Sequence, residues 1–167
     1  KQMKIQFSVV FLSALALASC RSHPFEGGAQ SKEELVRNFT AALAQGNADT
    51  IRSYLVRKKE YVEGIHPYTP EAKGIVGEEW WNTMIIRRRD MLTNGLIEKF
   101  KGKTCSVEIT GKEKKIEKFG PVTFYREIPV KIVCGDKDNL YTDESRYMFG
   151  IVVEKYGVFK LLNILND

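Results

Sequence analysis

The fold is decided by two alternating stretches, TCSVEI (104–109) and EIPVKIVC (127–134). In the first, Cys105, Val107 and Ile109 alternate with polar residues. In the second, every other position is apolar or cysteine, at Ile128, Val130, Ile132 and Cys134. A period of two residues is typical of a β-strand with one buried face. Because the spacing upstream of residue 104 is helical, the sequence predicts helices first and strands afterwards.

The two stretches predict one antiparallel pair around a turn at residues 119–121. A single register would set three pairs opposite each other: Cys105 with Cys134, Val107 with Ile132, and Ile109 with Val130. Both cysteines and the four apolar residues of these pairs then share one face. Pro129 cannot donate to a strand ladder, which predicts an open edge or a bulge at that position. The lysine-rich residues 112–118 are expected to form a hairpin tip that projects into solvent and blunts an exposed edge.

Helix-start signals stand upstream. Ser31 and Glu34 have capping-box spacing, Gly46 is a suitable helix end, and Asn47 can cap a second helix at once. The basic run 57–59 is expected at the end of that second helix, where positive charge complements the helix dipole. Residues 60–77 are rich in glycine and proline and are expected to be irregular, with a short strand as an option at 61–63.

A third helix is predicted from about Glu78. Its inner stripe is expected to consist of Trp81, Ile85, Arg88 and Leu92. This helix either ends at residues 94–95 or runs on to Phe100. Downstream, a strand from about Arg146 has apolar residues on both faces and is expected to be central in a sheet. Residues 154–157 fit a type I turn with a glycine bulge, followed by a last strand over 158–164.

The first twenty residues have the layout of a secretory signal: a basic start, an apolar run over 5–18, and LASC at 17–20. The run is shorter than the roughly 20 residues that a membrane-spanning helix needs. An uncleaved anchor helix and an ordinary buried helix are the alternatives. The segment resembles the signal of bacterial lipoproteins, which implies cleavage before Cys20, a diacylglycerol thioether on its sulfur and acylation of the new amino group by a chain such as palmitate.

That resemblance predicts the domain organisation and the location. We expect a signal peptide over 1–19, a flexible tether over 20–30 and a single domain over 31–167. The mature protein is expected in the bacterial cell envelope, bound through the lipid on Cys20 to the exported side of a membrane. Its other partner is expected to be a protein or a small ligand.

The net charge limits the kinds of partner to expect, and the number of cysteines bears on a disulfide. Loss of Lys1 and Lys4 from 26 basic residues leaves 24 against 21 acidic ones, a net charge of +3. So small a surplus, together with export, argues against nucleic acid. With Cys20 assigned to the anchor, Cys105 and Cys134 remain. An oxidising compartment favours a disulfide between them, and two buried free thiols are the alternative.

Two further stretches carry a resemblance to a fold family. FTAALAQGNADTI (39–51) and VVEKYGVFKLLNI (152–164) resemble the first helix-turn-helix and the final hairpin of the nuclear transport factor two-like superfamily. Phe159 stands where that superfamily often has tryptophan. The resemblance implies an α+β fold in which N-terminal helices pack on a curved antiparallel sheet to make a cone. It carries over no catalytic residue, because no catalytic motif matches.

Catalytic and metal signals are weak. The chain has two histidines, His23 and His66, and neither has metal-ligand spacing with a cysteine or with the other. No phosphate-binding loop or nucleophile elbow is found, so we assign no catalytic residue, metal or cofactor. Trp81, Arg88 and Tyr147 are the candidates for ligand binding. The competing interpretation places the aromatic residues in the core and the arginine outward in solvent.

These observations favour a non-catalytic, lipid-tethered envelope domain that binds a protein or a small ligand. The alternative is an enzyme of the isomerase or dehydratase type that uses the pocket of the cone, with an acid and a tyrosine brought together from distant positions. A purely structural or adhesive envelope protein is a third possibility.

Overall fold

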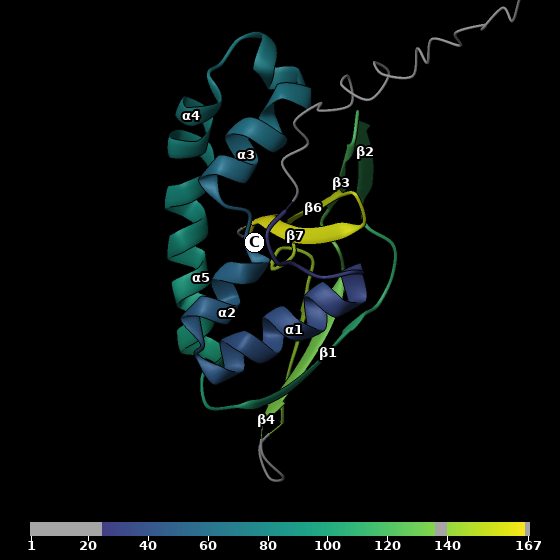
Figure 1. Ribbon diagram of the computed structural model, residues 1–167. Helices are drawn as coiled ribbons and strands as arrows, with labels where there is room; N and C mark the ends of the chain where they lie inside the picture. Colours follow the sequence, from purple (N-terminus) through teal and green to yellow (C-terminus); the bar gives the residue numbers. More distant parts are fainter. Residues whose placement is uncertain (1–24, 136–139, 166–167) are drawn as a thin grey trace, which may run out of the picture.

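A computed structural model describes residues 25–135 and 140–165. The protein is α+β. Its helices lie along one side and beneath, and two antiparallel sheets occupy the other side, neither of them closed (Figure 1). Cys20, the expected signal peptide and the first part of the expected tether lie outside the described residues.

The first helix begins and ends, and the second begins, where their capping residues predict. The Oγ of Ser31 accepts a hydrogen bond from the backbone N–H of Glu34 at 3.0 Å, Gly46 ends the first helix with φ 65°, and the side chain of Asn47 caps the second. The elements are α1 (Lys32–Gln45), α2 (Ala48–Tyr54), α3 (Lys58–Gly64), two 3-10 turns (His66–Tyr68 and Pro70–Lys73), α4 (Gly77–Trp80), a π-turn (Trp81–Ile85) and α5 (Ile86–Phe100).

The structure corrects the expectations for residues 57–77. The basic run 57–59 stands at the start of α3 and not at the end of α2, which stops at Tyr54. Residues 61–63 are helical, so the optional strand is wrong. The carboxylate of Glu60 explains why a new helix, α3, begins so soon after α2. It accepts a hydrogen bond from the backbone N–H of Arg57 at 2.8 Å and so caps α3.

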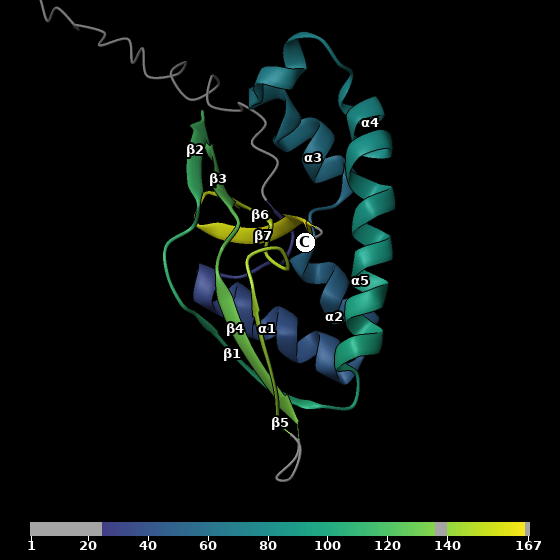
Figure 2. The same ribbon diagram turned by 180° about the vertical axis from the view of Figure 1, so that it is seen from behind.

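Segments α4, the π-turn and α5 form one helical column that runs the length of the molecule to Phe100 (Figure 2). The longer of the two predicted third helices is therefore correct. The expected inner stripe is wrong at Arg88, which is exposed, whereas Arg89 is buried. A π-turn takes more residues per turn than an α-helix. The buried positions consequently follow at four-residue intervals, Trp81, Ile85, Arg89 and Thr93.

The strands form two separate sheets, of order β1-β4-β5 and β2-β3-β6-β7. Their bounds are β1 (Thr104–Ile109), β2 (Lys115–Phe119), β3 (Val122–Arg126), β4 (Val130–Gly135), β5 (Leu140–Ser145), β6 (Ile151–Lys155) and β7 (Val158–Asn163). The predicted register of β1 and β4 is confirmed at all three pairs, including Cys105 opposite Cys134. The sulfur atoms of these two cysteines lie at disulfide distance.

The lysines at 112–118 are exposed, as expected, but the segment is not the tip of a β1–β4 hairpin. Lys115 and Lys118 belong to β2, which pairs with β3 and forms an edge of the four-stranded sheet. The chain changes sheet at residues 127–129, where Glu127 adopts φ 53° and Pro129 has no N–H to give. The interruption predicted at Pro129 is thus the junction between the two sheets, and the carbonyl of Pro129 accepts a hydrogen bond from Thr110.

The C-terminal strands also differ in detail. The strand expected from Arg146 begins only at Ile151, and β5 was missed because its residues do not alternate clearly. β6 does lie centrally, between β3 and β7. Tyr156 and Gly157 both have positive φ (53° and 79°), which defines a type I′ turn in place of the expected type I turn.

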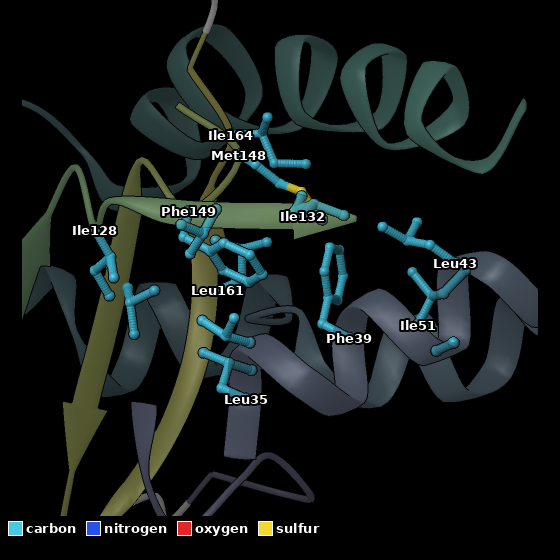
Figure 3. Packing of buried hydrophobic residues seen from close by; sticks show 14 of the residues in the cluster. Leu35, Phe39, Leu43, Ile51, Ile128, Ile132, Met148, Phe149, Leu161 and Ile164 are labelled. Carbon is cyan, nitrogen blue, oxygen red and sulfur yellow. The ribbon is translucent and has the colours of Figure 1, made fainter. Parts of the chain in front are cut away.

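Two apolar cores hold the layers together. The first fills the space between α1 and the strands, with Phe39 and Phe149 in edge-to-face contact at 5.8 Å (Figure 3). The second lies under α3 and the helical column and contains Tyr61, Trp81 and Val153.

Residues 25–30 belong to the fold, contrary to the expected tether over 20–30. Phe25 is buried in the second core and Ala29 in the first. Ala29 exchanges two backbone hydrogen bonds with Phe159 of β7, at 3.0 and 2.8 Å.

Candidate functional site

The main cleft lies between the helical side of the molecule and the four-stranded sheet and has a volume of about 330 Å³. Most of its wall is apolar. The helical side supplies Tyr61, Trp80, Met84 and Ile85, and the strands and the C-terminal segment supply Phe119, Phe124, Ile151, Leu162 and Leu165. Its polar side chains are Thr69, Glu71, Arg88, Glu117, Arg126 and Asn163. An apolar cavity with few polar groups is the usual form of a small-molecule site.

A line of residues across the sheet forms the floor of the cleft. Arg126 of β3 stands opposite Ile151 of β6, and Ile151 stands opposite Asn163 of β7. Directly opposite residues share one face of a sheet. Strict alternation along β7 would put Asn163 on the same face as Leu161, which belongs to the first core. A register shift between Ile151 and Val152 instead turns Asn163 toward the cleft.

Asn163 is a buried amide with an unused acceptor. Its side chain lines the cleft, the residue is 8% exposed, and its Oδ1 forms no hydrogen bond with any residue in 25–135 or 140–165. Leaving a buried polar atom unpaired costs on the order of 1–3 kcal/mol. Because Asn163 lines the cleft, this unpaired oxygen marks a place where a bound molecule can supply the missing donor once the side chain turns to meet it.

The charged group on the floor, Arg126, is already neutralised. The guanidinium of Arg126 donates to the carboxylate of Glu117, which also accepts from Lys115 at 2.7 Å. Hydrogen bonds from Lys115 and Arg126 hold the pKa of the Glu117 carboxyl below its usual value. Arg126 and Glu117 consequently add little net charge to the cleft.

The helical wall presents Arg88, Tyr61 and Glu71 among its polar residues. Arg88 is exposed at the cleft and makes no ion pair within the part of the chain that the structure describes. Tyr61 is buried, and its burial, followed by the charge of Glu71, raises the pKa of its hydroxyl above the usual value. The Tyr61 phenol is therefore protonated at neutral pH, beside a half-buried carboxylate at Glu71.

The three residues expected to bind ligand do not meet in one cavity. Arg88 lines the main cleft. Trp81 does not line the cleft but is packed in the second core. The centre of its ring lies 5.6 Å from that of the Tyr61 ring and 4.9 Å from the guanidinium carbon of Arg89. Tyr147 lines a second cavity of about 320 Å³ between the end of α5 and β4, where Met91, Leu96 and Met148 also lie. Leu165 borders both cavities.

Sequence reasoning missed Tyr61, Glu71, Arg126 and Asn163. Arg126 ends an alternating stretch, VTFYR (122–126), whose period could have placed Phe124 and Arg126 on one face. Nothing in the sequence marks the register shift that turns Asn163 inward, because a bulge depends on the strand that lies opposite.

Within residues 25–135 and 140–165, no cluster of three histidine, cysteine, aspartate or glutamate side chains has the geometry to hold a metal ion. None of the helices in the same residues has the length and apolar character needed to cross a membrane. Comparisons of the chain with protein-family models, with curated proteins and with solved structures found no match.

Proposed function

We propose that this protein is a lipid-tethered protein of the bacterial cell envelope whose main cleft binds a small amphipathic ligand without converting it. The observation that supports this is the cleft itself, which has a volume of about 330 Å³ and mostly apolar walls. Among residues 25–135 and 140–165, neither Oδ1 of Asn163 nor the guanidinium of Arg88 has a partner. Such a combination suits a molecule with an apolar body and a polar end. The lipoprotein-like signal that ends at Cys20 supports the location.

The proposal includes a nuclear transport factor two-like arrangement. Support comes from the order of elements, in which capped N-terminal helices precede antiparallel strands, and from the long helical column that faces the sheet across the cleft. The proposed anchor would hold the domain close to the bilayer. Phe25 is already in the core, so residues 21–24 alone would separate it from the lipid on Cys20, a reach of at most about 3.6 Å per residue.

Tryptophan fluorescence tests the binding site directly. The chain has two tryptophans, of which Trp80 lines the cleft and Trp81 does not. All described elements lie within 25–165, so a chain of residues 21–167 keeps the whole fold without the acylated residue. A bromine-bearing fatty acid, 11-bromoundecanoic acid, should quench this chain saturably. Trp80→Phe should lose most of the quenching. Equal quenching in Trp80→Phe, or no saturable quenching in the unsubstituted chain, would contradict the proposal.

The anchor has its own test, which does not depend on the cleft. Wild-type protein should sediment with membranes, and its intact mass should include the diacylglycerol and acyl groups. Cys20→Ala should lack both modifications and accumulate as unprocessed precursor. A wild-type mass without acyl groups, with protein in the soluble fraction, would contradict the proposed location.

A second candidate function is catalysis of the isomerase or dehydratase type. The observation in its favour is that Tyr61 and Glu71 line the same cleft and that the Glu71 charge acts on the Tyr61 hydroxyl. A protonated phenol can donate to a developing oxyanion while a carboxylate takes a proton. If the cleft is catalytic, the variants Tyr61→Phe and Glu71→Gln should bind the substrate as tightly as the wild type does. Each should convert it roughly 100-fold more slowly or worse. Unchanged composition of a ligand after prolonged incubation with wild type would leave binding as the function.

A further inference from the structure

Two polar groups of the cleft, Oδ1 of Asn163 and the guanidinium of Arg88, define the ligand more narrowly than the apolar walls do. We propose that the cleft selects amphipathic monoacids that carry a hydrogen-bond donor, an N–H or an O–H, between the apolar tail and the carboxylate, as N-acyl amino acids do. This inference rests on the proposed binding function of the same cleft and specifies its ligand class.

The donor is required by Asn163. An amide oxygen can only accept, and Oδ1 of Asn163 finds no donor among the described residues although the side chain is more than nine-tenths buried. A plain fatty acid, ionised at neutral pH, has no donor to offer and would leave this oxygen unpaired. A ligand N–H or O–H would satisfy it, and a buried acceptor that gains its donor in this way contributes to selectivity.

The single negative charge is required by Arg88. Of the two guanidinium groups in the cleft, Arg126 is engaged by Glu117, whereas Arg88 has no carboxylate partner in the described part of the chain. A ligand carboxylate can therefore pair with Arg88. The carboxylates of Glu71 and Glu117, which also line the cleft, disfavour a second negative charge on the ligand.

The apolar tail of the proposed ligand follows from the apolar residues that line the rest of the cleft. Phe119, Phe124 and Leu162 come from three strands and face the helical residues Met84 and Ile85. Burial of each methylene against such a surface contributes about 0.8 kcal/mol. An acyl chain is flexible enough to follow this lining.

Two matched compounds separate the donor from the acid and the tail. N-decanoylglycine has an N–H beside its acyl group, and N-decanoylsarcosine carries a methyl group in place of that hydrogen. Titration calorimetry with residues 21–167 should give a Kd for the glycine compound about 3- to 10-fold lower than for the sarcosine compound. Asn163→Leu should bring this ratio close to one. Asn163→Ala is the second variant if Asn163→Leu does not fold, as judged by its thermal melt.

The acid contact is tested in parallel. Arg88→Gln should weaken both compounds about 10-fold, because both carry the carboxylate. Arg87→Gln is the matched control, since Arg87 is an exposed arginine of the same helix that does not line the cleft, and it should leave both affinities unchanged.

The outcomes are distinct. If both compounds bind wild type equally, or if the ratio survives in Asn163→Leu, the donor inference is overturned while the proposed binding function stands. If neither compound binds although 11-bromoundecanoic acid quenches Trp80, the inference is likewise overturned and the binding function stands. If none of the three compounds binds, both the inference and the proposed function fail.

Discussion

The ammonium group of Lys160 on β7 lies 2.8 and 3.0 Å from the two carboxylate oxygens of Glu60 on α3. Both side chains are buried. The same carboxylate accepts backbone hydrogen bonds from Glu26 and Arg57, each at 2.8 Å. One carboxylate therefore joins the N-terminal segment, the start of α3 and the last strand. Burial lowers the pKa of Lys160, and the hydrogen bond that Lys160 donates to Glu60 opposes that shift.

Breaking this pair from one side should destabilise the protein strongly. Lys160→Met leaves the Glu60 carboxylate buried without its cation, and we expect a loss of about 3–5 kcal/mol in the free energy of unfolding. The double variant Lys160→Met with Glu60→Leu should recover part of the loss, because it removes the isolated charge. Urea unfolding of the two single variants and the double variant measures the coupling. Additive losses would contradict the interaction.

The cysteine pair should be oxidised in exported protein. Mass spectrometry without reductant should find Cys105 linked to Cys134, and two free thiols there would contradict the bridge. The cysteines are separated by 29 residues. Closing a loop of that size contributes about 3–4 kcal/mol in the chain-entropy model. Cys105→Ala with Cys134→Ala should lower the free energy of unfolding by about that amount.

Docking of the N-terminal segment should depend on Gly28. This residue has φ +92°, and an added Cβ would lie 2.8 Å from the carbonyl oxygen of Phe159, on the strand that Ala29 pairs with. Gly28→Ala should cost about 1–3 kcal/mol and expose the segment to proteolysis. Gly74→Ala is the control, since Gly74 has no atom within 4 Å of the added Cβ. Equal stability of the two variants would show that the segment does not dock as described.

Arg88 and Arg89 should behave oppositely although they are neighbours. Arg89 is buried and donates to the carbonyl of Val56 at 2.6 Å, and burial lowers its pKa. Arg89→Leu should therefore lower the free energy of unfolding by about 1.5–3 kcal/mol. Arg88→Leu should change stability by less than about 0.5 kcal/mol. Thermal melts of the two variants at equal concentration check the assignment, and a reversed order would contradict the π-turn.

Acid should weaken the link between β2 and β3 through Glu117. Because the pKa of Glu117 is lower in the folded protein than in the unfolded chain, its contribution to stability is complete above its usual pKa. The contribution is lost as pH falls through the lowered value. Glu117→Gln should cost on the order of 1 kcal/mol at pH 7 and progressively less below about pH 4. Urea midpoints measured across pH 2–7 test this, and a pH-independent difference would contradict it.

Glu117 also controls the charge of the cleft. Glu117→Gln should free the guanidinium of Arg126 and lower the Kd for N-decanoylglycine, because the ligand carboxylate then meets two cations instead of one. The matched control is Glu108→Gln, which removes a charge from β1 without touching the cleft lining. An unchanged Kd in Glu117→Gln would place the carboxylate away from Arg126.

The sequence by itself determined the local structure wherever the signal was local. Ser31, Gly46 and Asn47 fixed the ends of α1 and the start of α2, because a cap needs only its own few neighbours. The register of β1 and β4 also followed from the sequence, since this alignment puts both cysteines and the alternating apolar residues at 107, 109, 130 and 132 on one face. The α+β class followed from the change of period at residue 104.

Tertiary structure alone decided the site. The division of the strands into two sheets depends on where the chain finds partners after Glu127, and the period-two pattern is the same in either sheet. The choice of Arg89 over Arg88 depends on a π-turn, and the inward turn of Asn163 depends on a shift against β6. Each of these features places a side chain through contacts with residues far away in the chain. Periodicity describes only neighbours along the chain, so it could predict the elements and not the cleft between them.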